Sequence, residues 1–426
     1  MNLDIISQVK ARSKKVFYGW WVVVAGTVIG AFGAGTIFYG FSAFFNPMIA
    51  EFGWPRAAMA GVSSLSRLEG GLQGPIAGWL VDKFSPRRIL LIGVTIAGIG
   101  FMALSLVNSL LSLYLIFGLL LSMGFSLGYN NAPQAAVARW FIRKRGRAFA
   151  ILLSGNGIGG ALFLPLIAFL ITQFGWRWAV IFIGLATLAI PLTLSLLIKN
   201  SPEEMGLQPD GQPGTQESLS LETEFTTEEV DFTVREALKT GSFWTYAIAM
   251  MLRSFILSAI VVHQIPHLVD MGISYQTASA VLGLMILISI PGRLLFGWLG
   301  DRFSKKILLA LLCFVQGAGV FIFIQANTLP LLYLYIVIYG LSYGGVIPLT
   351  IALRADLFGR RNFATIGGLT MPLSMIGAVT APILAGYLYD VSQSYSRAFY
   401  IFLVMIVLSG VLFLFIPRPT PPKRYS

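Results

Sequence analysis

The residue with the strongest potential for chemistry is Arg293, which lies inside an apolar run of the stretch Ser289–Lys306, SIPGRLLFGWLGDRFSKK. Asp301 and the basic residues after it mark the point where this run reaches water. Arg293 precedes Asp301 by eight residues, so a helical rise of about 1.5 Å per residue places it roughly 12 Å inside the hydrocarbon. A guanidinium at that depth faces a cavity or a partner rather than lipid. Its planar fork of donors matches a carboxylate, which predicts an organic-anion site, with a structural ion pair as the alternative.

Four other ionisable side chains lie deep in apolar runs or at their ends. Arg253 is near the middle of its run and is interpreted either as a second anion contact or as a structural partner. Arg67 and Glu69 stand two residues apart and project from different helical faces, so they cannot simply pair with each other. Glu69 is either a second proton site or part of an inter-helical pair. Asp270 closes its run and is either a proton-exchanging group or a solvated cap of the next helix.

Uncharged groups near mid-membrane complete the candidate site. Phenol and amide groups bind carboxylates and hydroxyls, and hydrogen bonding between helices is the alternative role. An aromatic and methionine lining is also expected, with plain packing as its alternative. The candidate binding residues are Tyr129, Asn130, Asn131, Tyr343, Phe38 and Tyr39, and the further lining residues are Phe41, Met371 and Met375.

The elements that must position these residues are membrane-spanning helices. The chain has 426 residues, of which 56% are hydrophobic and 11% charged, which is too apolar for a soluble globule. Its apolar runs reach about 20 residues and do not alternate with polar ones, so they predict helices rather than barrel strands. Twelve spans are predicted, at 19–46, 57–81, 89–107, 111–138, 148–172, 178–198, 243–269, 274–298, 307–325, 329–353, 364–389 and 397–416.

The basic residues report orientation in the membrane. Of the 30 lysines and arginines, three lie within predicted spans, three lie on one side (Arg56, Arg177 and Arg397), and all the others lie on the opposite side. By the positive-inside rule both termini are cytoplasmic. The net charge of +12 is therefore explained by topology, and no nucleic-acid partner is expected.

Several other classes of site and segment are not expected. One cysteine and two histidines exclude a disulfide framework and an ordinary metal site, and no cofactor is predicted. The polar N-terminus has no short apolar core or small-residue cleavage site, so we do not expect a removable signal peptide. The chain also has no GxSxG, no HExxH and no paired intramembrane aspartates, so no catalytic residue is predicted.

The chain is a duplication. Gly78–Arg87 (GWLVDKFSPR) recurs as Gly297–Lys306 (GWLGDRFSKK), with six of ten positions identical. Two halves, 1–198 and 242–426, are therefore predicted, each with six spans, joined by a polar cytoplasmic linker at 199–241. An aspartate at such a turn pairs with a helix N-terminus or an arginine in only one conformation, so Asp82 and Asp301, with Arg302, are predicted to gate. A short amphipathic helix is expected near Thr233–Lys239 in the linker.

These motifs carry a resemblance. The paired GWLxD[KR]FS turns resemble the loop motif of the major facilitator superfamily, which implies a twelve-helix fold in two pseudo-symmetric halves. Tyr18–Val23 (YGWWVV) and Arg139–Ala150 (RWFIRKRGRAFA) are similar to signatures of the monocarboxylate transporters and of the related bacterial oxalate/formate antiporters. In both groups an arginine in span eight, just before the motif turn, holds the substrate carboxylate, and Arg293 occupies that place.

The resemblance implies a function and leaves one alternative open. It implies a secondary transporter in the plasma (inner) membrane that moves a small organic anion, such as lactate or pyruvate, together with a proton. Asp270 and Arg293 are the implied proton-coupling pair. Oxalate antiporters add a lysine in span eleven, but this chain has no lysine between Lys306 and Lys423, which favours a single carboxylate. Organic-anion exchange of the oxalate/formate kind is the alternative, and a monomer is expected. A cation exporter that uses Glu69, or a sensor on a transporter frame, is less compatible with these features.

Overall fold

The computed structural model describes residues 16–211 and 230–422, except for the side chains at 42, 45–46, 56–60, 63–70, 275–276 and 279. The described chain is helical, as the sequence predicted. Eleven helical segments within it are long and apolar enough to cross a bilayer, and α4 (Arg56–Phe84) is a further helix of 29 residues. The predicted all-α membrane fold with twelve spans is thereby confirmed.

Two of the six spans in the first half combine α-helix with wider π-helical turns. The first span joins α2 (Tyr18–Gly33) to the π-helical η1 (Ala34–Tyr39), after which η2 (Gly40–Phe44) leads into the short α3 (Phe45–Phe52). The fourth span consists of α6 (Leu110–Leu113), η3 (Tyr114–Leu121), α7 (Ser122–Gly124), η4 (Phe125–Asn131) and α8 (Ala132–Trp140). The remaining spans are α4, α5 (Pro86–Leu104), α9 (Arg145–Phe174), and α10 (Trp176–Ala189) with α11 (Pro191–Leu197).

The second half is more regular, with one α-helix for each span. Thr240 and Ser274 cap the first two helices, because their side chains accept hydrogen bonds from the backbone of Phe243 and Thr277. A 30-residue helix is about 45 Å long, which exceeds the roughly 30 Å of hydrocarbon, so these helices project beyond it or tilt. The six helices are α14 (Gly241–Asp270), α15 (Tyr275–Gly300), α16 (Lys305–Ile324), α17 (Leu329–Phe358), α18 (Phe363–Ser392) and α19 (Ser396–Leu414).

Each half has its own hydrophobic core. Ile29, Leu90 and Trp140 belong to the core of the first half, and Ile256 and Phe323 belong to that of the second. The first core also includes a few residues of α17 and α18, namely Ala352, Ala355, Phe363 and Ala364. Two bundles with separate cores can move against each other as units, and they share packed side chains near the ends of α17 and α18.

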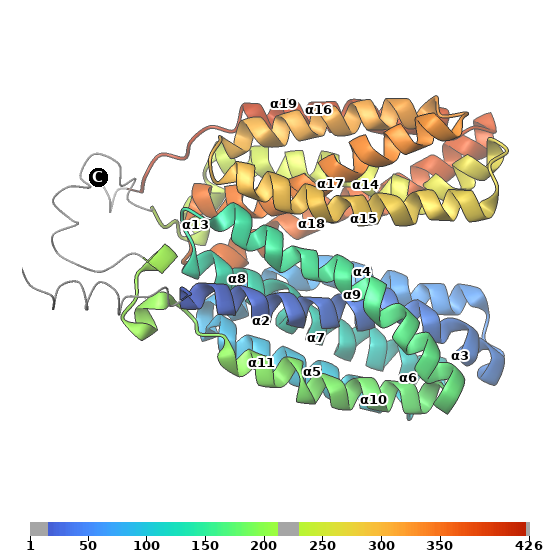
Figure 1. The fold of residues 1–426 in the computed structure, drawn as a ribbon, viewed down its shortest axis with the longest axis horizontal. Helices are drawn as coiled ribbons and strands as arrows, with labels where there is room; N and C mark the ends of the chain where they lie inside the picture. Colours follow the sequence, from blue (N-terminus) through green and yellow to red (C-terminus); the bar gives the residue numbers. More distant parts are fainter. Residues whose placement is uncertain (1–15, 212–229, 423–426) are drawn as a thin grey trace, which may run out of the picture.

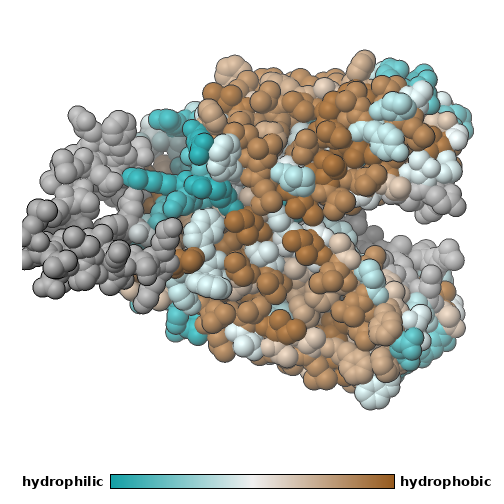
Figure 2. Space-filling model, in the orientation of Figure 1, coloured by the Kyte–Doolittle hydropathy of each residue, from teal (hydrophilic) through white to brown (hydrophobic). Residues whose placement is uncertain are grey.

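The two halves meet along α4 with α18 and along α9 with α15 (Figure 1). The linker elements lie at one end of the bundle, which is called the linker end below, and α2 begins and α19 ends there. Figure 2 shows the halves in contact at the linker end and separated at the opposite end. The structure is therefore closed at the linker end and open at the other.

The linker is anchored to both halves by aspartates. Asp210, in the turn η6 (Pro209–Gly211), accepts hydrogen bonds from three backbone amides just before α9, at 2.7–3.1 Å. Asp231 accepts bonds of 2.8 and 3.0 Å from two amides before α18. The expected short helix is confirmed as α13 (Val234–Leu238), which Thr233 and Glu236 cap reciprocally. The residue boundaries of the two halves stay predictions.

Candidate functional site

Arg293 projects from α15 into the interface between the two halves. Its side chain is 6% exposed, and Nη1 donates to the carbonyl of Leu153 on α9 at 2.5 Å. Nη2 lies 3.4 Å from the Ser289 hydroxyl one turn earlier, and Nε has no hydrogen-bond partner among the described residues. The guanidinium thus contacts both halves and keeps donor capacity for an anion. No acidic side chain forms a described ion pair with it, so the structural-pair alternative has no support among the described side chains.

Tyr39 of the first half lies near Arg293 and near Tyr343 of the second half. Tyr39 ends the π-helical η1, and its ring packs against α9 at Gly160, where an added Cβ would come within 2.8 Å of it. Tyr39 is within electrostatic range of both Arg293 and Tyr343. Tyr343 on α17 stacks with Tyr339, with centroids 6.4 Å apart. π-Helical segments are frequent at functional sites, and η1 positions the Tyr39 side chain near Arg293. The structure therefore places Tyr39 near two other predicted residues, Arg293 and Tyr343.

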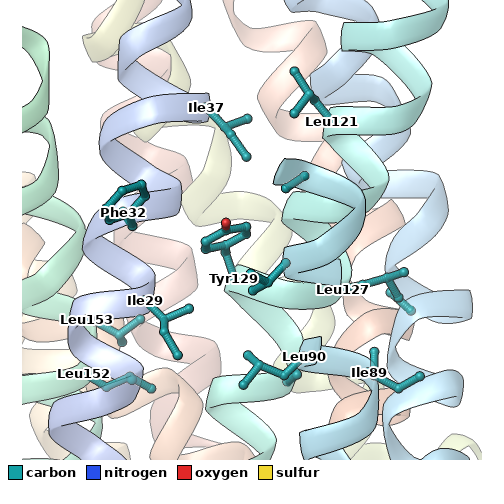
Figure 3. Close-up of a cluster of buried hydrophobic side chains, with 14 of the residues drawn as sticks. Ile29, Phe32, Ile37, Ile89, Leu90, Leu121, Leu127, Tyr129, Leu152 and Leu153 are labelled. Carbon is teal, nitrogen blue, oxygen red and sulfur yellow. The ribbon is translucent and has the colours of Figure 1, made fainter. Parts of the chain in front are cut away.

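The predicted patch on the fourth span separates into different environments. Tyr129 is 6% exposed, and Figure 3 shows it among apolar side chains that include Phe32 and Ile37. Its hydroxyl faces that of Thr187 on α10, without a bond that meets hydrogen-bond geometry among the described residues. Asn131 is also buried and donates to the carbonyl of Ser126 at 3.0 Å, a bond within its own helix. Tyr129 thus faces a neighbouring helix, as the inter-helical alternative holds, whereas the Asn131 bond stays within its own helix. A binding role for both residues stays a prediction.

Asn130 borders a small polar hollow close to Arg293. Its Oδ1 accepts from Gln134 Nε2 at 2.7 Å. The hollow also touches Leu153, whose carbonyl is the acceptor for Arg293. Sequence reasoning missed Asn156, although an amide among the glycines of α9 is a detectable signal of a polar site. The hollow is lined by Gly26, Gly30, Tyr129, Asn130, Pro133, Gln134, Leu152, Leu153 and Asn156.

The residues expected to form an apolar lining lie in three different environments. Phe38 is 57% exposed and meets Tyr39 edge to face at 4.9 Å. Phe41 is buried in the core of the first half, which agrees with the alternative that this side chain only packs. Met371 and Met375 of α18 pack against glycines of α4, where the halves touch. Of these residues, only Phe38 extends the group formed by the two tyrosines and Arg293.

Asp270 is not brought to Arg293. It is exposed at the last residue of α14, within electrostatic range of Tyr389. Arg293 lies 18 residues beyond the first residue of α15, which is about 27 Å along that helix from the same end of the bundle. Direct proton exchange between the two is therefore without support in this conformation, and the coupling role stays a prediction. Arg67 and Glu69 lie outside the described side chains.

Asp301 makes one of two related contacts between the halves at the linker end. Its carboxylate accepts bonds from the backbone amides of Gly146 and Arg147 at 2.7 and 3.3 Å, and from Arg147 Nε at 2.7 Å. These amides begin α9, whose N-terminus carries partial positive charge. Burial raises the pKa of Asp301, while the bonds from Arg147 and Gly146 act in the opposite direction.

Asp82 makes the symmetry-related contact. It accepts bonds from the backbone amides of Ala364 and Thr365 at 3.3 and 2.7 Å and from the Thr365 hydroxyl at 2.6 Å. Arg139 approaches it at 3.9 Å. Each motif aspartate thus caps the first turn of a helix from the other half, as expected of groups that pair in one conformation only. A gating role for both stays a prediction.

Close backbone approach accompanies both caps. An added Cβ on Gly146 would lie 2.1 Å from the carbonyl oxygen of Gly297, and one on Gly78 would lie 2.2 Å from that of Ala364. No side chain fits at such distances, so these glycines allow the linker end to close.

Arg302 contacts its own half. Its guanidinium lies 3.9 Å from the centroid of Trp298, so the cross-half cation at this contact is Arg147, which sequence reasoning did not single out. A further link joins Asp356 of α17 to Arg145 of α9 at 3.3 Å and to Lys305 at 2.6 Å.

Comparison with known proteins agrees with this architecture. A family model described as Major Facilitator Superfamily matches residues 27–377 and 270–426. Relatives include monocarboxylate transporter 12 of Mus musculus, 26% identical over 429 residues, covering 95% of this chain and 87% of the relative. Monocarboxylate transporter 13 of Bos taurus is 27% identical, covering 93% and 88%, and monocarboxylate transporter 11 of Homo sapiens is 28% identical, covering 95% and 84%.

Solved structures share the fold at lower identity. The proton:xylose symporter XylE superposes with a TM-score of 0.71 at 15% identity, covering 94% of this chain and 96% of XylE. The fucose:proton symporter FucP of E. coli gives a TM-score of 0.69 at 13% identity, covering 93% and 99%.

Proposed function

The chain belongs to the major facilitator superfamily and is related to the monocarboxylate transporters, and from this premise we propose that it carries a small monocarboxylate, such as lactate or pyruvate, together with a proton. Transport proceeds by alternating access, in which the two halves rock around a site between them. The protein resides in the plasma (inner) membrane with both termini and the linker in the cytoplasm, so the linker end is the cytoplasmic end. It acts as a monomer without catalytic site, metal or cofactor.

The observation that carries this proposal is the placement of Arg293. A guanidinium is buried between two bundles, bonded to a backbone carbonyl of the opposite half, with no described acidic partner. In such a low-dielectric site a carboxylate supplies both the missing charge and acceptors for parallel N–H donors. Tyr39 is within electrostatic range of Arg293 and of Tyr343 from the other half, which supports a role for both hydroxyls as donors to the same ligand.

The same contact links binding to movement. Arg293 bonds to Leu153 across the α9–α15 interface, so this bond breaks when the linker end opens and the two helices separate. A bound carboxylate replaces the lost hydrogen bond to the guanidinium. The barrier to the conformational change is therefore lower for the loaded carrier than for the empty one.

The proposal favours one carboxylate over two. In α18, where a lysine would serve a second carboxylate, the chain has Thr370 and Ser374. Both hydroxyls already donate to backbone carbonyls of their own helix, at 2.7 and 3.2 Å. A dicarboxylate would therefore place one charge in the cavity without a cation at this position. Organic-anion exchange of the oxalate/formate kind is the competing proposal.

Uptake into proteoliposomes tests these proposals. Labelled lactate and pyruvate should accumulate when an inward proton gradient is imposed, and Arg293→Ala should abolish this uptake. Arg293→Lys should retain little, because a point charge cannot reproduce the planar fork. Arg397→Ala, which removes an exposed arginine at the open end, is the matched control and should transport normally.

Two outcomes would contradict the proposal. Normal uptake by Arg293→Ala would remove this residue from the substrate site. If uptake did not depend on the proton gradient but required an anion inside the vesicle, the protein would be an exchanger and not a proton symporter.

A further inference from the structure

A second arginine is buried away from Arg293, in the interior of the second half. Arg253 lies 12 residues after the first residue of α14, which is about 18 Å from the linker end and near mid-membrane. Its side chain is 5% exposed, and neither Nε nor Nη2 has a hydrogen-bond partner in the described residues. Ala249 and Ile256, one turn away on either side along α14, are fully buried in the core of this half.

Two more polar side chains with unused hydrogen-bonding groups lie in the interior of the second half, and one of them is within electrostatic range of Arg253. Gln316 of α16 and Tyr339 of α17 are both 0% exposed. The Gln316 amide and the Tyr339 hydroxyl have no partner that meets hydrogen-bond geometry among the described residues, yet they face each other, and Tyr339 is within electrostatic range of Arg253. Cys313, one turn before Gln316, is within range of Arg253 as well. Helices α16 and α17 thus each carry a side chain within electrostatic range of Arg253 on α14, and Gln316 faces Tyr339.

The second half cannot neutralise this charge itself. After Gly241 the chain has four acidic residues, Asp270, Asp301, Asp356 and Asp390, and each lies at or close to a helix end. An uncompensated guanidinium at mid-membrane is strongly unfavourable. Water can satisfy its donors but leaves its charge uncompensated, whereas an anion does both.

We propose that Arg253, Gln316 and Tyr339 form a binding site for one small inorganic monovalent anion, for which chloride is the probe. If the Tyr339 hydroxyl donates to Gln316 Oε1, then Gln316 Nε2 and the free Nε and Nη2 of Arg253 remain as donors. One positive charge matches one negative charge. The neighbours Ala249, Ile256, Gln316 and Tyr339 are all fully buried, so the occupant we propose is a small anion without an organic chain.

The site has a structural route to the substrate cavity. Tyr339 stacks on Tyr343, which lies near Tyr39, and Tyr39 in turn lies near Arg293. An anion that orders Tyr339 therefore also orders one wall of the cavity. The inference does not depend on the proposed transport function, because anion binding is measured on the purified protein without any substrate.

Thermal unfolding of the purified full chain tests the proposal. The melting temperature is measured in sodium chloride and in sodium gluconate at equal ionic strength, since a ligand that binds the folded state raises Tm as its concentration exceeds Kd. The wild type should show a saturable rise in chloride and none in gluconate, and Arg253→Gln should lose the rise. Arg293→Gln, which removes the buried arginine between the two halves, should keep it.

Further variants keep the test decisive if Arg253→Gln does not fold. Gln316→Leu should weaken the chloride dependence at least tenfold in midpoint, and Arg253→Lys should retain a weaker one. In crystals grown in bromide, anomalous scattering should appear beside Arg253. A wild-type Tm that does not distinguish chloride from gluconate, or a rise that persists in Arg253→Gln and disappears in Arg293→Gln, would overturn the proposal.

Discussion

Neutralising the two motif aspartates should shift the protein away from the conformation closed at the linker end. Asp82 and Asp301 each accept three hydrogen bonds from the first turn of a helix in the opposite half. Asparagine has the same shape, but it lacks the charge and turns an N–H₂ group toward backbone N–H donors. Asp82→Asn, Asp301→Asn and the double variant are therefore the perturbations.

The magnitude follows from the contacts. A hydrogen bond to a charged acceptor contributes about 1.5–3 kcal/mol, and asparagine keeps one acceptor oxygen. The Asp301 ion pair adds at most about 1 kcal/mol, because the side chain of Arg147 is 40% exposed. A net loss of about 2 kcal/mol for each aspartate shifts the equilibrium by about 30-fold, and both losses together shift it by about 1000-fold.

The assay is a distance measurement between spin labels at the open end. Leu106 and Leu329 belong to different halves and are 77% and 51% exposed, so cysteines there accept labels, and the buried Cys313 is replaced by serine. In the wild type the distance between the two labels should be mainly long, because the end of the bundle that carries them is open. The variants should populate a shorter distance, most strongly in the double variant.

A matched control separates this effect from simple charge removal. Asp390→Asn neutralises an exposed aspartate of α18 that makes no described contact across the halves, and it should leave the distances unchanged. An unchanged distribution in the Asp82→Asn, Asp301→Asn double variant would refute the reasoning that these caps hold the linker end closed.

Two further predictions concern valence and the proton. Oxalate should inhibit lactate uptake poorly, because its second charge costs several kcal/mol without a cation in α18. Inhibition as strong as that by pyruvate would contradict the single-carboxylate site. Asp270→Asn should slow gradient-driven uptake but spare counterflow exchange, because the empty carrier must return deprotonated only during net uptake. Glu69→Gln should leave the ratio of gradient-driven uptake to counterflow exchange unchanged. Equal loss of both modes in Asp270→Asn would indicate a structural role beside Tyr389.

The positions of the helices were readable from the sequence because a bilayer imposes a local rule. Each span must be long, apolar and hydrogen-bonded within itself, so a one-dimensional pattern is sufficient. The span predicted at 274–298 is the helix Tyr275–Gly300, and the one predicted at 364–389 is Phe363–Ser392. The π-helical turns of the first and fourth spans were not predictable, since they depend on the neighbours against which those spans pack.

The candidate site was only partly readable. A charge at depth is so costly that Arg293 stands out from the sequence alone. Its acceptor, the Leu153 carbonyl, and the nearby Asn156 were missed, because a backbone carbonyl has no sequence signature and a lone amide only a weak one. Tyr129 and Asn131 were singled out by type and depth, yet both side chains are buried in the first half.

By itself the sequence determined that this chain spans a membrane in two related halves, with one deeply placed arginine before the second of two repeated turns. Only the tertiary structure decided which helix ends meet, with Asp301 at the start of α9 and Asp82 at the start of α18. It also decided that Arg253 is buried within range of Cys313 and Tyr339, inside the second half. The reason is physical. Span positions follow from local transfer free energies, whereas the rotation of each helix and its partners follow from packing between segments more than a hundred residues apart.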